Sequence, residues 1–350
     1  MNPSAGKTFV RTMKSLAVAK GAIPGAIGYA QSQNWDNARA VIDSLKAAVT
    51  GQSMSDAFVA TPAAVDFADF IRPLTIIGKL TGLRRTPART RMISATSGST
   101  AYWAGEAQPR PISKMTLSGS TLEALSVVAM LVVTQELIQS SSPDAEPILS
   151  RDLAAAAVQA MDAAFVDSSN AGIAGVKPAA VTNGVTTIHS SGSTLANIDA
   201  DLQLIIEALA AAGSDLTFAT WVVRPRTAVY LSTLRGSGGA LAYPQMGVRG
   251  GVLAGLPCIT SAASPSDAGS PALGGEIVLL DPSQIVVVDS GDGSIEASTQ
   301  ASIAMADNPG SPASQVSAFQ TNSTILKTVR FVNWQACRPG VAQVIDRVGY

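Results

Sequence analysis

The sequence is poor in the residues that build reactive centres and cross-links. Its 350 residues include one histidine, His189, and two cysteines, Cys258 and Cys337, which lie far apart. A Ser-His-Asp or Cys-His site needs a histidine base, and a lone histidine in a predicted loop is typical of a surface residue. Two distant cysteines cannot form a disulfide framework, so we expect free thiols and assembly in a reducing cytoplasm.

Patterns for metal and nucleotide binding are missing as well. No cluster of His, Cys, Asp and Glu has the spacing of metal ligands. The glycine-rich loop at 236–251 matches neither the GxxxxGK[ST] phosphate loop nor a GxGxxG that opens a helix after a strand. Glu106 and Glu136 are the only carboxylates that we considered as catalytic acids, and both also have a structural interpretation. We expect no cofactor, no metal and no enzymatic activity; a cytoplasmic α/β hydrolase using Glu106 or Glu136 is the alternative.

Aromatic residues, net charge and long apolar runs are also scarce. Aromatics make up 5% of the chain, charged residues 14%, and the formal net charge is −1. The apolar runs at 125–133 and 277–288 are shorter than the ~18–20 residues that span a bilayer, and the first 30 residues lack the apolar core of a signal peptide. We expect a soluble protein without a membrane partner. Hydrophobic residues reach 47% and mean hydropathy is +0.26, which is enough for a packed core.

Positive charge gathers in two stretches. Residues 1–50 carry six Lys and Arg against Asp36 and Asp43, and residues 71–91 carry six basic residues and no acid. These stretches predict a solvated or subunit-facing basic surface, which we favour, or direct contact with a polyanion.

The first 120 residues predict an arm followed by a hairpin. Two weakly amphipathic segments, Thr8–Ala19 and Trp35–Val49, flank Gly21–Gly28, and with few bulky residues this region is expected to lie on another surface. Short alternating pieces at Thr90–Ile93 and Thr100–Trp103 predict two strands joined by a turn at 97–99. Because a two-stranded hairpin is marginal in water, we expect it to need a partner surface, such as another copy.

The next segment predicts one strand and one long helix. A strand is expected over Thr121–Ile138. Ser142 and Pro143 form a helix start, and small residues at spacings of three and four continue to Asp167. A helix over 143–167 would be ~37 Å long at ~1.5 Å per residue. Such a helix can act as a rigid spine.

The second half of the chain alternates helices and strands in an α/β pattern. Helices are expected at Leu195–Ala212 and Pro225–Leu234. Strands are expected at Thr220–Val223, Pro257–Thr260, Glu276–Leu280, Gln284–Asp289, Ser323–Trp334 and Gln343–Asp346. Residues 171–193 are interpreted as a turn-rich connector and 292–315 as a polar segment. No period repeats, which excludes a solenoid or propeller.

Six degenerate motifs occur in a particular order. Trp103 and Glu106 lie in the polar loop, Thr134-Gln135-Glu136-Leu137 ends the strand, and Met161-Asp162-Ala163-Ala164-Phe165 closes the helix. Further downstream come Trp221–Pro225, Gly247–Ser261 and Glu276–Asp289. Together they resemble the tailed-phage major capsid protein family with the Hong Kong 97-type fold, over roughly residues 57–350.

The resemblance implies an α+β fold and a division of the chain. It implies an amino-terminal arm at 1–65, an extended loop at 84–118 and an axial domain at 191–319. It implies a peripheral domain made from 66–83, 119–190 and 320–350, which holds the spine helix. With about 60 residues before the body, either the scaffold is a separate protein or this is a processed or short form.

The same resemblance implies a function and partners. It implies a non-enzymatic subunit of an icosahedral virion head, forming pentamers and hexamers around double-stranded DNA and meeting portal, scaffold and decoration proteins. Assembly would occur in the host cytoplasm. An encapsulin-like nanocompartment shell is the alternative within the same fold. The implied candidates for contacts between subunits are Arg84, Arg85, Trp103, Glu106, Lys114 and Glu136. Lys114 is the only lysine in the loop, but no motif identifies an asparagine partner, so we expect no covalent cross-link.

Overall fold

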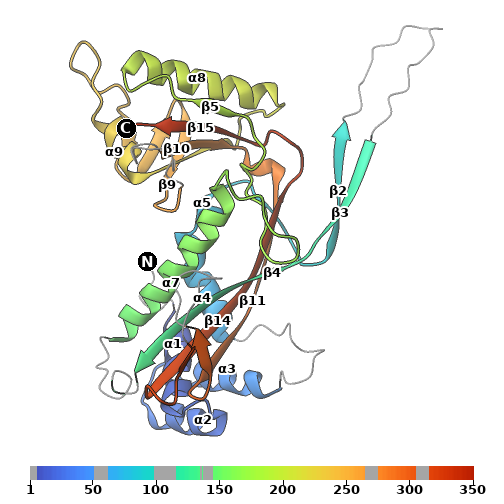
Figure 1. Ribbon diagram of the computed structural model, residues 1–350, viewed down its shortest axis with the longest axis vertical. Coiled ribbons are helices and arrows are strands. Elements are labelled where there is room, and N and C mark those ends of the chain that lie inside the picture. Colours follow the sequence, from blue (N-terminus) through green and yellow to red (C-terminus); the bar gives the residue numbers. More distant parts are fainter. Residues whose placement is uncertain are drawn as a thin grey trace, which may run out of the picture. The chain divides into compact units, whose positions relative to one another are not determined.

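The structure is a computed structural model that describes residues 6–50, 62–97, 116–134, 136, 145–264, 275–304 and 315–350. It combines helices with mixed and antiparallel sheets, as expected for an α+β protein (Figure 1). The chain divides into two compact units, each built from distant segments. One contains Met1–Gly78, Ser126–Met161 and Ser290–Phe331; the other contains Lys79–Leu125, Asp162–Asp289 and Val332–Tyr350.

The first unit opens with a bundle of helices. These are α1 (Lys7–Val18), α2 (Ile23–Ser32), α3 (Ala38–Thr50) and α4 (Pro62–Ile71), followed by the short η1 (Arg72–Leu74) and α5 (Ile76–Lys79). Helix α1 contacts the other three long helices. Their shared core consists of five buried residues, Leu16, Ala26, Ala30, Val41 and Leu45. Phe9 of α1 also stacks on Phe67 of α4, with ring centroids 4.0 Å apart.

The helix bundle corrects the expectation that residues 1–60 bury little of themselves. Ala26 and Ala30 have no exposed surface, because their small side chains let α2 approach its neighbours closely. The segment at 21–28 was expected to separate two helices, yet most of it belongs to α2. Pro24 lies in the first turn, where an N–H group would have no acceptor within the helix, so its missing N–H costs no hydrogen bond. Whether this bundle acts as an arm stays a prediction.

Helix α7 (Ala145–Val166) has 22 residues, close to the predicted span, and is about 33 Å long. Its buried stripe differs from the expected one. Leu153, Ala157, Met161 and Phe165 recur every four residues and are buried, whereas Ala156 and Ala160, which we expected inside, are exposed. In an alanine-rich helix, several different faces carry small apolar residues at spacings of three and four. The bulky Met161 and Phe165 decide which of these faces is buried.

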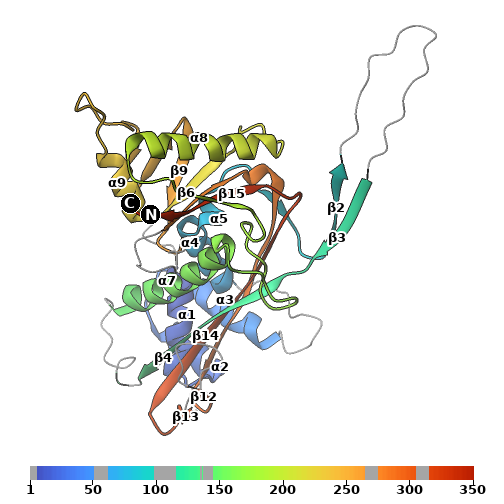
Figure 2. The same ribbon diagram turned by 45° about the horizontal axis from the view of Figure 1, so that its top comes forward.

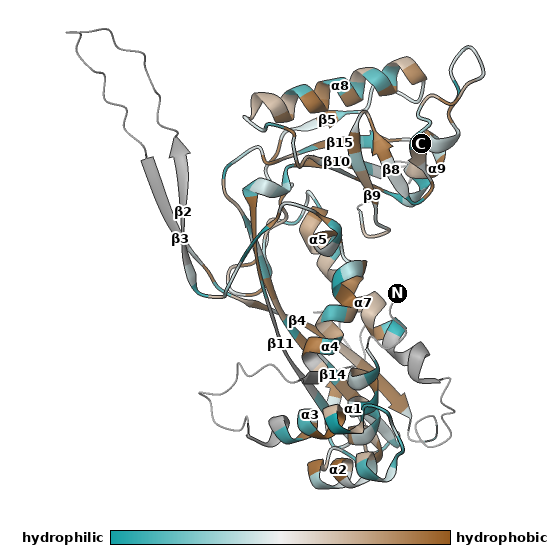
Figure 3. Ribbon diagram, turned by 180° about the vertical axis from the view of Figure 1, so that it is seen from behind, coloured by the Kyte–Doolittle hydropathy of each residue, from teal (hydrophilic) through white to brown (hydrophobic). Residues whose placement is uncertain are grey.

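A seven-stranded mixed sheet forms the centre of the second unit. Its strands lie in the order β5 (Thr187–His189), β15 (Ala342–Val348), β10 (Gly275–Leu280), β6 (Thr220–Val223), β9 (Leu256–Thr260), β8 (Gly250–Leu253) and β7 (Met246–Gly247). Helix α8 (Leu195–Ala211) lies across this sheet and contacts β15 and β10 (Figure 2). Along α8, hydrophobic and hydrophilic residues alternate (Figure 3), as expected for a helix with one buried face.

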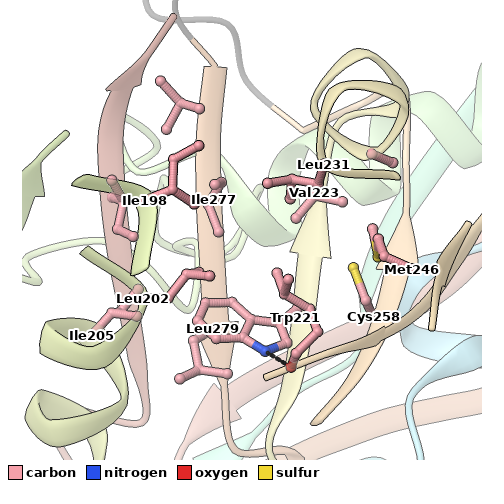
Figure 4. Packing of buried hydrophobic residues seen from close by; sticks show 14 of the residues in the cluster. Ile198, Leu202, Ile205, Trp221, Val223, Leu231, Met246, Cys258, Ile277 and Leu279 are labelled. Atoms are coloured by element: carbon pink, nitrogen blue, oxygen red, sulfur yellow. Dashed lines mark hydrogen bonds between the residues drawn. The ribbon is translucent and has the colours of Figure 1, made fainter. Parts of the chain in front are cut away.

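The core of the second unit lies between its sheet and its helices. Ile198, Leu202 and Ile205 of α8 and Leu231 of α9 (Pro225–Thr233) pack against the sheet around Trp221 (Figure 4). The Trp221 side chain is fully buried, and its Nε1 donates to the Leu253 carbonyl oxygen at 3.0 Å. A buried indole needs such an acceptor, because an unpaired N–H would carry the full cost of desolvation.

A second sheet contains the longest strands. Its order is β1 (Arg84–Thr86), β11 (Ile285–Ser298), β14 (Ser323–Ala336) and β4 (Leu125–Thr134). Strand β11 extends nine residues beyond the predicted end at Asp289, and two short strands, β12 (Ser302–Ala304) and β13 (Gln315–Ser317), pair with each other. The polar segment expected over 292–315 therefore contains strand residues in its described parts, which the sequence did not predict.

The hairpin is present, but its partner strand is not the predicted one. Strand β2 (Thr90–Ser97) pairs antiparallel with β3 (Thr116–Leu122), from Thr90 opposite Leu122 to Ser97 opposite Thr116, with an irregularity between Ala95 and Ser97. The sequence analysis paired β2 with 100–103 through a turn at 97–99. The pairing of Ser97 with Thr116 excludes that turn, and 100–103 lies outside the described residues.

Candidate subunit-contact site

The β2–β3 hairpin is the most open element of the fold. Within the described residues it forms a sheet of two strands, with no third strand on either edge (Figure 1). Such a pair is marginally stable alone, and its edges offer backbone N–H and C=O groups to another strand or surface. Of the predicted contact residues, Trp103, Glu106 and Lys114 lie in the loop beyond this ladder, outside the described residues.

Arg84 and Arg85 lie side by side on β1, which runs parallel to β11. Nη1 of Arg85 lies 3.4 Å from Oδ2 of Asp289, whose side chain is only 2% exposed. Arg85 therefore has a partner within its own chain, and its charge offsets that of a buried carboxylate. Arg84 is exposed, and its positive charge opposes the increase in the pKa of the Cys337 thiol that burial causes. The two arginines therefore differ in their surroundings: Arg85 has an acidic partner within the chain, and Arg84 is exposed.

Strand β4 brings apolar side chains to the surface at the edge of its sheet. Val128 is 45% exposed and Met130 is 59% exposed, while Val133 farther along the strand is buried. Glu136, two residues beyond the end of β4, is exposed. An edge strand with exposed apolar residues is a liability in an isolated protein.

In the helix bundle, Asp36 and Asp66 have partners within the bundle, while several cations are exposed. The Asp66 carboxylate accepts hydrogen bonds from the backbone N–H groups of Gly6, Thr8 and Phe9 at 3.0–3.3 Å. Arg11 pairs with Asp36 and holds the pKa of that carboxyl below its usual range. The exposed cations of α1, α3 and the turn after α1 are Lys7, Lys20, Arg39 and Lys46. The sequence analysis identified these charges but missed Asp66, whose role depends on a contact across 58 residues.

The end of α7 is held by a buried polar contact. Asp162 is 1% exposed and accepts a hydrogen bond from Oγ of Ser261 at 3.0 Å. Ser168, just beyond the helix, donates to Oε1 of Glu276 at 2.6 Å. Asp162 belongs to a motif that the sequence analysis quoted, and the structure gives it a mechanical role: it connects the helix to the residue that follows β9.

His189 and the two cysteines, which the sequence offered as candidates for reactive groups, lie within the described residues. His189 lies at the end of β5, and its Nδ1 is 2.6 Å from Oδ1 of Asp346, with the imidazole 58% exposed. In the described ranges, no group of three or more His, Cys, Asp or Glu could hold a metal ion. Both cysteines are free thiols, as predicted. Among the helices that the structure describes, none is long and apolar enough to cross a membrane.

Comparison of the chain with known proteins identifies its family. A model of the phage capsid family matches residues 69–345. The capsid polyprotein of Pseudomonas phage PAJU2 is 34% identical to the chain over 365 residues, which cover 99% of the chain and 54% of that protein. The chain belongs to the phage capsid family. It spans about half the length of this curated relative.

Other capsid proteins agree in sequence and in fold. The major capsid protein of Klebsiella oxytoca phage phiKO2 is 26% identical over 333 residues, which cover 93% of the chain and 74% of that protein. A solved chain from Gordonia phage Cozz superposes with a TM-score of 0.55 at 18% identity, covering 76% of this chain and 84% of that one. The capsid of a native GTA particle gives a TM-score of 0.52 at 15% identity, covering 77% and 89%. The chain has the Hong Kong 97-type capsid fold, and the resemblance seen in its motifs is confirmed.

Proposed function

We propose that this chain is the major capsid protein of a tailed double-stranded DNA bacteriophage. Copies would assemble into the pentamers and hexamers of an icosahedral head, and the chain would act in the virion after assembly in the host cytoplasm. The observation that carries this proposal is the 34% identity over 99% of the chain with a capsid polyprotein. The role is structural and requires no cofactor.

Two structural features support self-assembly. The β2–β3 hairpin lacks a third strand among the described residues, and β4 exposes Val128 and Met130 at the edge of its sheet. Both would gain stability by burying backbone edges and apolar side chains against a second copy. The predicted contact residues Arg84, Trp103, Glu106, Lys114 and Glu136 belong to this proposal, while Arg85 already has Asp289 as a partner.

The packaged genome is the second proposed partner. The bundle α1–α4 exposes Lys7, Lys20, Arg39 and Lys46, and two of its acids, Asp36 and Asp66, are engaged by groups of the same bundle. A basic surface of this kind binds phosphates without reading sequence, and the binding weakens as salt rises. The bundle would then face the interior of the head. Portal, scaffold and decoration proteins are further proposed partners.

The domain division is part of the same proposal. Residues 1–65 would form the amino-terminal arm, 84–118 the extended loop and 191–319 the axial domain. Residues 66–83, 119–190 and 320–350 would form the peripheral domain around α7.

Negative-stain electron microscopy of the purified protein tests the proposal. We expect large angular shells. Small round shells of a single size would indicate an encapsulin-like nanocompartment instead. Small particles that never assemble, even with a co-expressed scaffold, would contradict the proposed function and leave the hydrolase alternative, which predicts a monomer or small oligomer with a cleft.

A further inference from the structure

A cationic cavity lies in the second unit, and none of the contact residues or exposed cations named for the proposed function lines it. Its volume is about 790 Å³, and its walls are the loop at 171–186, the start of β4, and the segment at 333–343 that connects β14 to β15. Its charged lining residues are Lys177 and Arg338, and none of the described residues that line it is an aspartate or glutamate. The sequence predicted a turn-rich connector at 171–193 and indicated no function for it.

The walls of this cavity are held rigidly. Nδ2 of Asn170 donates to the carbonyl oxygens of Ala164 and Pro178 at 2.8 and 3.0 Å, which ties both ends of the loop at 171–177 to the end of α7. Nε1 of Trp334 donates to the carbonyl oxygen of Ala179 at 2.8 Å. Thr182 also donates to the Val166 carbonyl oxygen at 2.9 Å. A site whose walls are fixed before binding loses little conformational entropy when it is filled.

Arg338 is the unusual residue of the cavity. Its Nε and Nη2 are buried and have no hydrogen-bond partner. Nη1 lies beside Gly213, just after α8, where an added Cβ would be 2.9 Å from it. The guanidinium therefore lies near the carboxyl end of α8, whose partial negative charge favours a cation. Arg338 as a whole is half-buried, but two of its donors are buried without an acceptor, and burying a donor without a hydrogen-bond partner is costly.

The rim of the cavity adds an apolar contact surface. Ile173 is 61% exposed and Val176 is 65% exposed, and both lie on a tight turn closed by hydrogen bonds between the backbones of Ile173 and Lys177. Gly172 and Gly175 have φ near +75°, which allows this turn to project its side chains outward. Arginine is enriched among the residues that contribute most to protein–protein binding, and the exposed Ile173 and Val176 add apolar surface that a partner could bury.

From these contacts we infer that the cavity accepts a carboxylate side chain from a second copy of this chain, while Ile173 and Val176 contact the surface around that side chain. The inference rests on the proposed function, which places many copies side by side. The two unpaired nitrogens of Arg338 have no surface open to water. The arginine would therefore have to change its rotamer before a carboxylate could accept hydrogen bonds from them. Duplex DNA fits poorly, because Lys177 and Arg338 line a cavity and the phosphates of a duplex lie on the outside of a wide, stiff helix that cannot enter it.

Substitution of Arg338 separates this docking role from a purely structural one. In the free subunit, Arg338→Gln removes two buried donors that have no acceptor, so we expect the urea unfolding midpoint to stay equal or to rise. In assembly, the same variant should raise the subunit concentration needed for shells by about tenfold or more, because the incoming carboxylate loses its partner. Arg338→Lys should restore assembly in part. Arg226→Gln, at an exposed position on α9, is the matched control for the loss of one positive charge.

Shells formed by the wild-type protein give the direct test. Amide hydrogen exchange over residues 171–177 should be slower in shells than in unassembled subunits, and a high-resolution map should show an aspartate or glutamate of a neighbouring copy beside Arg338. A lower unfolding midpoint for Arg338→Gln with normal shell formation would assign the arginine a structural role and overturn the inference. Shells whose cavity holds only water or an inorganic ion would overturn it while leaving the proposed function intact. Failure of the wild-type protein to form any shell would contradict both.

Discussion

At the scale of single residues, carboxylates in this chain act as anchors for the backbone and for helix ends. Asp66 satisfies three backbone donors at the start of α1, where helical N–H groups have no partner within the helix. Asp162 performs a comparable task at the far end of α7 through Ser261. Both contacts join residues that are distant in sequence, so each fixes how two elements meet.

The Asp66 contact predicts a measurable loss of stability. Asp66→Ala leaves three donors at the α1 terminus to water, so we expect the free energy of unfolding of the free subunit to fall by about 1–2 kcal/mol. Urea denaturation followed by circular dichroism measures it. Asp69→Ala is the control, because the Asp69–Arg72 pair is exposed and should change stability by less than about 0.5 kcal/mol. Equal losses in the two variants would contradict the capping role.

The two thiols should differ in reactivity. Burial raises the pKa of Cys258 to about 12, so at pH 8 only about one thiol in ten thousand would be the reactive thiolate. We expect iodoacetamide to leave Cys258 unlabelled in the folded subunit at pH 8 and to label it in guanidinium. The half-buried Cys337 should react with iodoacetamide faster than Cys258 and more slowly than a fully exposed cysteine. Mass spectrometry of peptides would show the opposite order if Cys258 were accessible.

At the scale of elements, one face of each helix decides how it packs. The buried face of α8 carries Ile198, Leu202, Ile205 and Leu209, which lie three or four residues apart along the helix. Thr194 caps its first turn by accepting a hydrogen bond from the backbone N–H of Asn197. Such a helix is stable because it covers the sheet, and isolated helices of this length are marginal in water.

Adjacent residues on α8 give a matched pair of substitutions. Ile205 has no exposed surface, while Leu204 is 50% exposed. Ile205→Ala should lower the free energy of unfolding by about 2–4 kcal/mol because it opens a cavity in the core. Leu204→Ala should change it by less than about 1 kcal/mol. Urea denaturation of both variants checks the burial pattern, and a comparable loss in Leu204→Ala would contradict it.

At the scale of the whole molecule, the structure leaves several surfaces that a single copy does not cover. The hairpin, the edge strand β4 and the Ile173–Lys177 turn expose backbone edges or apolar side chains. An isolated globular protein usually hides such features, whereas a shell subunit buries them against neighbours. Membership of the phage capsid family gives these surfaces a common explanation.

Charge reversal on β1 distinguishes folding from assembly. Arg84→Glu should leave the unfolding midpoint of the free subunit unchanged and reduce the yield of shells. Arg85→Glu should lower the unfolding free energy by about 1 kcal/mol, because it places a negative charge beside the buried Asp289. Sedimentation and electron microscopy measure the yield, and urea denaturation measures the stability. Normal shells from Arg84→Glu would rule out Arg84 as a subunit contact.

The sequence by itself determined the elements whose signals are local. Strand β6 was predicted at its observed ends, and α8 and α9 begin at the predicted residues, because capping residues and apolar periodicity lie within a few positions of each other. The ordered motifs were sufficient to predict the capsid fold. They also singled out Arg84 and Arg85, but not which of the two already has an acidic partner within the chain.

Only the tertiary structure decided the features that depend on distant partners. It selected β3 as the partner of β2, turned Met161 and Phe165 of α7 inward, and packed α1–α4 into a bundle with its own core. It also brought Arg338 to a cavity wall that contains the loop at 171–186 and the start of β4. Local patterns do not contain this information, because strand pairing, burial and charge compensation depend on contacts that form only when distant parts of the chain meet.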